Sequence, residues 1–321
     1  MQNSGEKVIK FNKDTFWALY GIPIALIIIC VVLIVTTKSF ASMDNVFNIL
    51  RQISILTIAA MGTTLILISG GIDISMGSVM AFSGVVSIAL IVDAGIDYRV
   101  AILVALCAGA LVGALNGVLV TVIKIPPFIA TLGTMQMVRG LCFVYTGGYS
   151  LYGDIPQAFT NIGRGYIGVV PVPVIIMVLA VVVFYLIANY TKIGIYTYSI
   201  GCNEKASRLS GINVKKVRLI LYTLAGVMSA LAGVLLSARL NSAQANVANG
   251  FEFDILTAVV LGGTSIYGGK GNIARTMLGA IVIGVINNGM TLLNVNTFYQ
   301  MIANGAILVL AIALDRINAK D

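Results

Sequence analysis

The chain has 321 residues, of which 59% are hydrophobic and only 10% are charged, and its mean hydropathy is +0.99. Soluble domains carry about 25% charged residues, so this composition excludes an ordinary soluble protein. The 20 Lys and Arg residues outnumber the 12 Asp and Glu residues, which gives a net charge of +8. There is no histidine, and the four cysteines are scattered, so we expect neither a disulfide framework nor a metal site. The composition predicts an all-α polytopic membrane protein.

Apolar runs close to the roughly 20 residues of one membrane crossing recur along the whole chain. We predict ten transmembrane helices in one domain that covers residues 1–321. Residues 1–16 form an N-terminal tail, and residues 189–218 form a long loop after the sixth span. The eighth span is short and rich in glycine, which predicts a broken or tilted helix. The predicted boundaries are 17–37, 46–69, 77–92, 100–122, 127–146, 167–188, 219–238, 254–267, 274–293 and 298–314.

Lys and Arg residues sort unevenly between the two sides of the predicted membrane. If the N-terminus lies in the cytoplasm, ten alternating spans place most of the basic residues there too, whereas the acidic residues show no such bias. This asymmetry predicts that both termini are cytoplasmic. Topology and lipid headgroups account for the positive charge, so we expect no nucleic-acid partner. The basic loop residues that fall outside are Lys38, Arg51, Arg99, Arg164 and Arg239.

Two glycine-rich interruptions, at residues 68–78 and 261–272, each follow one apolar run and precede another. Broken hydrophobic segments at matching places in two halves of a chain are typical of duplicated transporter cores. We therefore predict a duplicated core broken by glycines. Two ordinary glycine-rich turns are the alternative.

A polar, basic segment at residues 201–214 interrupts the apolar sequence. Asn203 is a candidate helix N-cap, and Glu204 follows where the helix dipole favours an anion. Gly211 can end the helix in a left-handed conformation, and Asn213 can cap the helix that follows. The segment predicts a small amphipathic element that docks in a partner's groove. Its candidate contact residues are Gly201, Asn203, Glu204, Ala206, Leu209, Ser210, Gly211 and Ile212.

Several polar residues interrupt the predicted spans. Arg139 lies deep in the fifth span, where a charge is costly and usually faces a cavity or a partner, and Gln136 lies three residues earlier on the same face. Such residues either line a polar route for a hydroxylated solute or join helices by hydrogen bonds. For Asp73, capping of the third span is the alternative to pairing with a cation. The candidate pathway residues are Gly70, Gly71, Asp73, Ser75, Asn116, Gln136, Arg139, Asn287 and Asn288.

The sequence lacks the motifs of several chemistries. The nearest approach to a phosphate-binding loop runs from Gly263 to Lys270, but the glycine spacing is wrong and Gly271 stands where Ser or Thr is needed. Proton-coupled carriers usually carry acids or histidines in mid-span, and almost all acids here fall in loops or at span ends. No catalytic constellation is present. We expect no enzymatic activity and no cofactor.

The motifs together resemble one family. Residues 69–78, S-G-G-I-D-I-S-M-G-S, resemble the S-G-G-I-D-L-S-V-G-S signature of the ribose/xylose/galactose family of ABC-transporter permeases. Residues 201–214 are similar to the family's G-x-N-x-x-A-x-x-S-G-I-N-V loop, although Cys202 and Lys205 stand where Gly and Ala are expected. Residues 127–133, 258–265 and 268–271 also match, so the resemblance runs from about residue 40 to the C-terminus.

The resemblance implies a permease subunit of a monosaccharide importer in the bacterial cytoplasmic membrane, working by alternating access. It implies three partners: a second copy of the chain, a cytoplasmic P-loop ATPase that docks on the 201–214 loop, and an extracytoplasmic sugar-binding protein. Ribose is the first expectation, with xylose, galactose and nucleosides open. The alternative is a secondary transporter that works alone on a small polar solute.

Overall fold

The computed structural model describes residues 13–318, and every predicted span contains a helix. The bounds of these helices are α1 (Lys13–Thr36), α2 (Met43–Ile68), α3 (Met76–Val92), α4 (Tyr98–Thr121), α5 (Pro127–Thr146), α7 (Val172–Tyr190), α10 (Val214–Leu240), α11 (Phe251–Leu261), α12 (Ile273–Leu292) and α13 (Thr297–Asn318). The helices of the first five spans are α1 to α5. Helices α7 and α10 lie on either side of the long loop, and α11, α12 and α13 follow an irregular segment after α10.

Six of these helices, α2, α4, α5, α7, α10 and α12, are long and apolar enough to cross a membrane. Helix α11 is different, because its 11 residues extend only about 16 Å at 1.5 Å per residue, half of a hydrocarbon core about 30 Å thick. The region predicted as the eighth span thus contains a short helix that is not long enough to cross the membrane alone. Irregular backbone at residues 241–250 precedes α11, and irregular backbone at residues 262–272 follows it.

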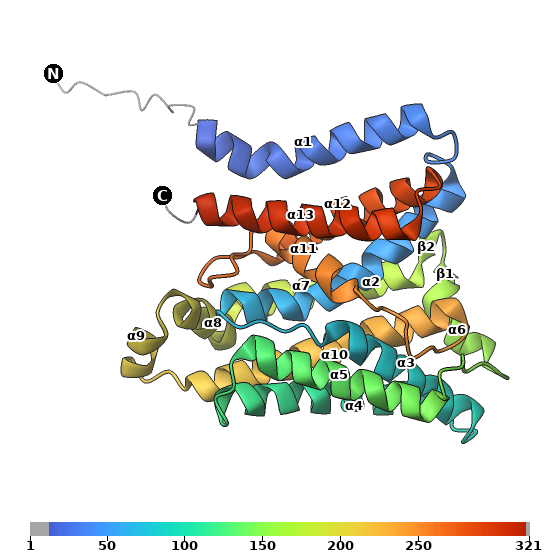
Figure 1. The fold of residues 1–321 in the computed structure, drawn as a ribbon, viewed down its shortest axis with the longest axis horizontal. Helices are drawn as coiled ribbons and strands as arrows, with labels where there is room; N and C mark the ends of the chain where they lie inside the picture. The colour runs from blue at the N-terminus through green and yellow to red at the C-terminus, as the bar shows by residue number, and fades with distance from the viewer. Residues whose placement is uncertain (1–12, 319–321) are drawn as a thin grey trace.

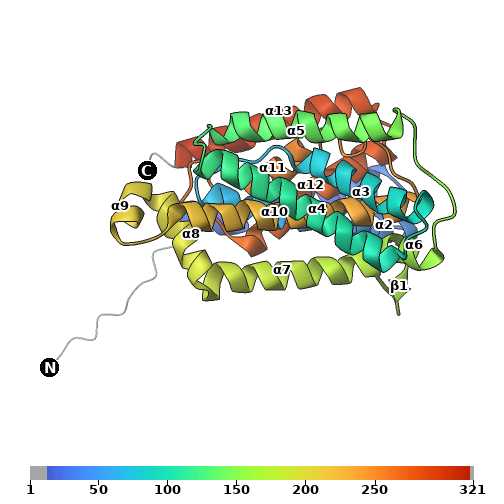
Figure 2. The ribbon, with the colours of Figure 1, turned by 90° about the horizontal axis from the view of Figure 1, so that it is seen from below.

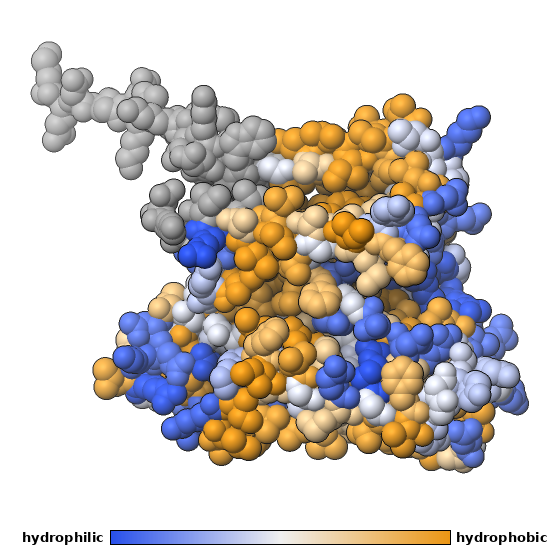
Figure 3. Space-filling view, viewed as in Figure 1, coloured by the Kyte–Doolittle hydropathy of each residue, from blue (hydrophilic) through white to orange (hydrophobic). Residues whose placement is uncertain are grey.

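The long helices run side by side, and their ends form two opposite faces of the molecule (Figures 1 and 2). The first described residues of α1 and the last of α13 lie at the same end as α8 (Lys192–Cys202) and α9 (Glu204–Leu209), which we call the α9 end. The opposite end, the α6 end, carries α6 (Gln157–Arg164). Hydrophobic side chains cover the middle of the surface and hydrophilic ones gather at both ends (Figure 3). This arrangement is that of a multi-pass membrane protein.

Helices α2 and α10 form the centre of the molecule. Helix α2 is buried along nearly its whole length, and α10 packs against α2, α3 and α4. Helices α10 and α4 approach closely at Gly226 and Gly109, where an added Cβ would overlap the backbone of the facing helix. In a membrane, helix association depends on such close contact, because lipid tails are as apolar as the side chains they replace. The glycines therefore fix the position of the core helices.

The structure adds local elements that the sequence analysis did not predict. These are α6, α8 and a hairpin of two short antiparallel strands, β1 (Tyr166–Ile167) and β2 (Val170–Pro171). The two strands comprise only four residues, so the structure is consistent with the predicted all-α membrane protein. The sixth span was predicted to start at residue 167, but α7 begins at Val172, after Pro171. Proline is favoured at helix starts because it lacks an N–H group, which the first turn does not use.

We predict that the two ends face opposite sides of the membrane. Leu209, in α9, and Val169, in the hairpin turn, are both strongly exposed. In a variant without the exposed Cys107 and Cys202, we introduce Leu209→Cys or Val169→Cys. A membrane-impermeant maleimide added to intact cells should label only the second, because the positive-inside rule predicts that the basic α9 end faces the cytoplasm. Labelling of both variants before permeabilisation would contradict this topology.

Candidate functional site: a glycine junction below α8 and α9

The structure confirms the local predictions for the 201–214 segment. The Asn203 side chain accepts a hydrogen bond from the backbone N–H of Ala206 (3.0 Å) and caps α9. Gly211 has a φ of +82°, the left-handed conformation that ends the segment. The Asn213 side chain accepts from Lys216 N (3.0 Å) and caps α10. These contacts arise within the segment itself, which explains why the sequence alone indicated them.

Helix α9 presents an apolar side chain to the surface of the α9 end. Leu209 is 91% exposed, and Ala206 on the same helix is exposed too. Ser207 is buried and donates a hydrogen bond to Asn203 O (2.9 Å), so it fixes the inner side of the helix. A leucine this exposed at a polar end of the molecule is suited to a pocket on another protein. Of the other predicted contact residues, Ser210 and Gly211 are exposed, Ile212 is half-buried, and Gly201 faces inwards.

Below α8, both glycine-rich breaks meet at one place, which we call the glycine junction. It consists of Gly70 from the first break, Gly268 and Gly269 from the second, and Gly201 from α8. Gly269 N donates to Ile68 O (2.9 Å), which joins the two breaks directly. An added Cβ on Gly201 would overlap these same two atoms. The close approach of three chain segments thus requires glycine here.

Charged and phenolic side chains extend this junction. Glu204 of α9 pairs with Arg218 of α10 (2.9 Å), and the Arg218 Nη2 donates to Ser69 O (3.0 Å) in the first break. Partial burial favours a raised pKa for the Glu204 carboxyl, but the Arg218 and Arg208 charges outweigh it and lower that pKa. Tyr198 of α8 donates to Gly271 O (3.0 Å) in the second break. The α8–α9 element is therefore bonded to both breaks.

The first break contains a buried chain of hydrogen bonds. Ser75 donates to the Asp73 carboxylate from both its backbone N (2.8 Å) and its Oγ (2.7 Å). Asn116 of α4 donates to Ser75 Oγ (2.9 Å), and Thr134 of α5 donates to Asn116 Oδ1 (2.6 Å). The structure thus brings three predicted pathway residues together and adds Thr134. Asp73 accepts from the backbone N–H of Ser75, the N-cap residue of α3, and no basic side chain among the described residues pairs with it.

The two neighbouring asparagines of α12 have different partners. Asn288 and Asn45 of α2 exchange two amide hydrogen bonds (2.9 and 3.1 Å), so Asn288 joins two buried helices. Asn287 donates to the Asp254 carboxylate (3.2 Å), which also accepts from Asn304 of α13 (2.9 Å). Sequence reasoning missed Asp254 as a site residue because it lies at the start of a predicted span, where an acid is common.

Arg139 binds backbone carbonyl groups within the chain. Its Nη1 donates to Ala245 O (2.6 Å) and Val247 O (2.7 Å), in the irregular segment before α11. Gln136 is exposed on the surface of α5. The expectation that both side chains face a common cavity is wrong within the single chain, because Arg139 turns inwards to satisfy two carbonyl groups that no helix pairs.

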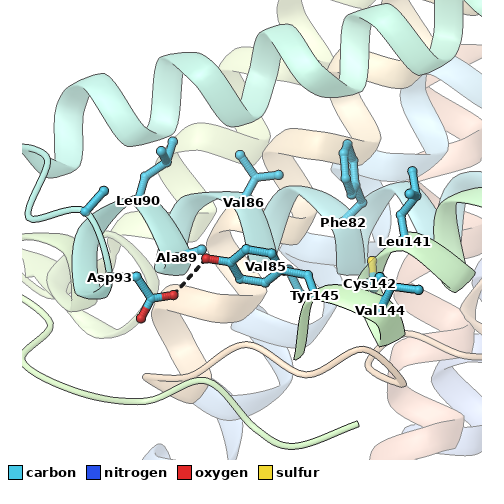
Figure 4. Close-up of a pocket in the computed structure, with 11 residues that line it drawn as sticks. Phe82, Val85, Val86, Ala89, Leu90, Asp93, Leu141, Cys142, Val144 and Tyr145 are labelled. Carbon is cyan, nitrogen blue, oxygen red and sulfur yellow. Dashed lines mark hydrogen bonds between the residues drawn. The ribbon is translucent and has the colours of Figure 1, made fainter. Parts of the chain in front are cut away.

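A groove of about 510 Å³ runs between α3 and α5 (Figure 4). Its wall is apolar, with Phe82 and Val86 from α3 and Leu141 and Val144 from α5. At its rim the Tyr145 hydroxyl donates to Asp93 (2.8 Å). None of the predicted pathway residues lines this groove, so it is separate from the polar network of the first break.

These features define a polytopic membrane protein whose surface helix is bonded to two breaks in its core. The family described as "Branched-chain amino acid transport system / permease component" matches residues 45–312, and the chain belongs to this family. No solved structure gives a significant match to the chain.

Curated relatives cover nearly the whole chain. A ribose import permease protein of Bacillus subtilis (strain 168) is 43% identical over 308 residues, 96% of this chain and 95% of that protein. A ribose import permease protein of Escherichia coli (strain K12) is 41% identical over 295 residues, 91% of this chain and 92% of that protein. A D-allose transport system permease protein of the same strain is 35% identical over 312 residues, 97% of this chain and 95% of that protein.

We predict that Gly201→Ala lowers the free energy of unfolding by about 1–3 kcal/mol, the usual cost of overpacking. The added methyl overlaps Ile68 O and Gly269 N, so the two breaks must separate. The matched control is Gly305→Ala in α13, where the new Cβ meets no atom within 4 Å. Thermal unfolding in detergent compares the two variants. Equal stability would show that the junction tolerates a side chain.

We also predict that Arg139→Leu lowers thermal stability and transport together, because two carbonyl groups lose their partner. A buried unsatisfied polar group costs about 1–3 kcal/mol. Arg139→Lys keeps one charged donor and should lose less. If the Arg139→Leu variant keeps full thermal stability but loses transport, Arg139 contacts the solute instead. If the variant keeps both thermal stability and transport, the contacts to the two carbonyl groups contribute to neither.

Proposed function

We propose that this chain is the permease subunit of an ATP-driven importer of a monosaccharide, with ribose as the first candidate. The observation that carries the proposal is that hydrogen bonds and an ion pair connect the α8–α9 element to both glycine-rich breaks. Two relatives above 40% identity are named ribose import permeases, and the shared length supports a common cargo. The permease itself performs no hydrolysis; a separate ATPase subunit supplies the energy.

In this proposal a cytoplasmic P-loop ATPase binds α9, and Leu209 enters a groove on that partner. A rigid-body movement of the ATPase displaces α8 and α9. The displacement passes through Gly201 to the junction of the two breaks and through Glu204 and Arg218 to Ser69. Because the breaks have few helical hydrogen bonds to resist it, they are the segments that shift between inward-open and outward-open states. This is the physical basis of alternating access here.

The solute route and the remaining partners follow from the exposed surfaces. We infer that two copies pair through α5, whose exposed side carries Gln136 and small residues at Gly133 and Gly140, a pattern suited to helix pairing in lipid. An extracytoplasmic sugar-binding protein docks at the α6 end. The first-break network of Asp73, Ser75 and Asn116 lies along the route between them, next to Gly70 and Gly71.

The same proposal includes the finer topology. Residues 1–321 form one transmembrane domain with ten crossings, in which the segment 241–261 provides the eighth and α3 with its preceding break provides the third. The core is duplicated around the two breaks, both termini and residues 189–218 are cytoplasmic, and the chain lies in the bacterial inner membrane. A transporter that works alone would have no use for the exposed Leu209 of α9.

The proposal predicts that ribose uptake into proteoliposomes requires the permease, its ATPase and a ribose-loaded binding protein together, and that Leu209→Asp abolishes it. An unpaired charge buried in the interface costs on the order of 3–5 kcal/mol, so ATPase capture should fall several-hundred-fold or more. Co-purification of the tagged ATPase measures the capture directly.

The control is Val169→Asp, an equally simple change at the α6 end, which should leave ATPase capture intact. If Leu209→Asp captures the ATPase and transports ribose normally, α9 is not the coupling element. If the unmodified assembly transports no ribose but another monosaccharide, the cargo assignment is wrong and the importer class stands. Uptake without any ATPase would favour a secondary transporter.

A further inference from the structure

A partly open cavity of about 190 Å³ lies between α2, α10, α11 and α12. Most of its wall is apolar and includes the aromatic ring of Phe251. Three polar side chains interrupt this wall: Gln52 from α2, Arg239 from α10 and Asn287 from α12. Small-molecule sites have this composition, an apolar wall with a few convergent polar groups. The volume lies below the range of about 300–1,000 Å³ that drug-sized ligands occupy, so the cavity suits a smaller solute.

The amide of Asn287 is held in one orientation. Its Nδ2 donates to the Asp254 carboxylate (3.2 Å), and Asn304 Nδ2 donates to the other carboxylate oxygen (2.9 Å). An ionised carboxylate only accepts hydrogen bonds, so the Asn287 amide must turn its NH₂ group towards it and its oxygen away. That oxygen, Oδ1, is buried and has no hydrogen-bond partner among the described residues. Such an orphaned acceptor requires a donor.

The other polar groups of the cavity specify the chemistry of the occupant further. Arg239 Nη2 donates to Asn48 (2.6 Å), and its guanidinium has further N–H groups to offer. The Gln52 side chain makes no hydrogen bond within the described chain and can both donate and accept. An ionised carboxylate cannot satisfy Asn287 Oδ1, because its oxygens only accept hydrogen bonds. A hydroxyl group fits, since it donates to Asn287 and accepts from Arg239 or Gln52.

We propose that this cavity is a subsite for a neutral polyhydroxylated solute inside each protomer, with Gln52, Arg239 and Asn287 as the contacts. Asp254 and Asn304 are positioning residues that fix the Asn287 amide. The subsite lies in the half of the membrane towards the α6 end, beside α11, which is the shorter of the two broken segments. The inference rests on the proposed function, whose monosaccharide cargo is a solute of this class.

The test uses the full-length permease with its ATPase subunit in lipid nanodiscs. D-ribose should raise the midpoint of thermal unfolding in a concentration-dependent manner, because a ligand that binds only the folded state stabilises it. Asn287→Leu and Gln52→Leu should each weaken the ribose dependence roughly tenfold or more, the usual effect of losing one well-placed hydrogen bond in a desolvated site. Gln52→Leu breaks no hydrogen bond within the described chain and so remains informative if Asn287→Leu fails to fold.

The matched control is Asn189→Leu, an exposed asparagine on α7 far from the cavity, which should keep the full ribose effect. Sodium sulfate at equal concentration should produce no cavity-dependent shift; a sulfate shift that Gln52→Leu removes would identify an anion site and overturn the proposal. So would a ribose shift unchanged in both cavity variants, or no ribose shift in the unmodified protein. Ribose uptake by the reconstituted importer is measured separately, so normal uptake without a cavity effect refutes the subsite and leaves the proposed function intact.

Discussion

Backbone groups that leave a helix inside a membrane must find partners within the protein, because lipid offers none. This requirement organises the structure. Where α2 ends, Ile68 O accepts from Gly269 N, Ser69 O accepts from Arg218, and Ile72 O accepts from the Tyr222 hydroxyl (3.0 Å). Before α11, Ala245 O and Val247 O accept from Arg139. Arg139, whose charge appears costly in an apolar span, is thus the partner of a broken segment.

The same requirement links the surface to the core. A break that is satisfied by side chains of other elements moves when those elements move. The first break is bonded to α4, to α10 and to the second break, and the second break is bonded to α2 and α8, so neither break can change conformation independently of its neighbours. When α8 moves, Gly271 O must therefore either lose its hydrogen bond from Tyr198 or move with α8. This coupling is a property of the hydrogen-bond pattern and requires no flexible hinge.

The sequence predicted the elements better than the contacts between them. Long apolar runs set the helices, and the caps at Asn203 and Asn213 depend on neighbours three residues away, which a sequence displays. The short α6 was not predicted because it has no apolar run, and the hairpin was not predicted because its apolar residues continue into the run that was assigned to the sixth span. The carbonyl partners of Arg139 lie 106 and 108 residues away, so its role as a backbone anchor could not be deduced from its depth in the span. The meeting of the two breaks is equally non-local, although their matching glycines indicated that they belong together.

The reciprocal amide pair between Asn45 and Asn288 has a consequence for how this chain can diverge. Changing Asn45 to leucine leaves both polar atoms of the buried Asn288 amide unpaired, and changing Asn288 leaves Asn45 Oδ1 unpaired, although Asn45 Nδ2 keeps its bond to Phe40 O (2.9 Å). Changing both to apolar residues of similar size can be nearly neutral. The effects of substitutions at these two positions, 243 residues apart, therefore depend on each other. Related sequences in which one position has become apolar should have lost the other amide too. The two positions should therefore co-vary, and this co-variation would reflect the contact between α2 and α12.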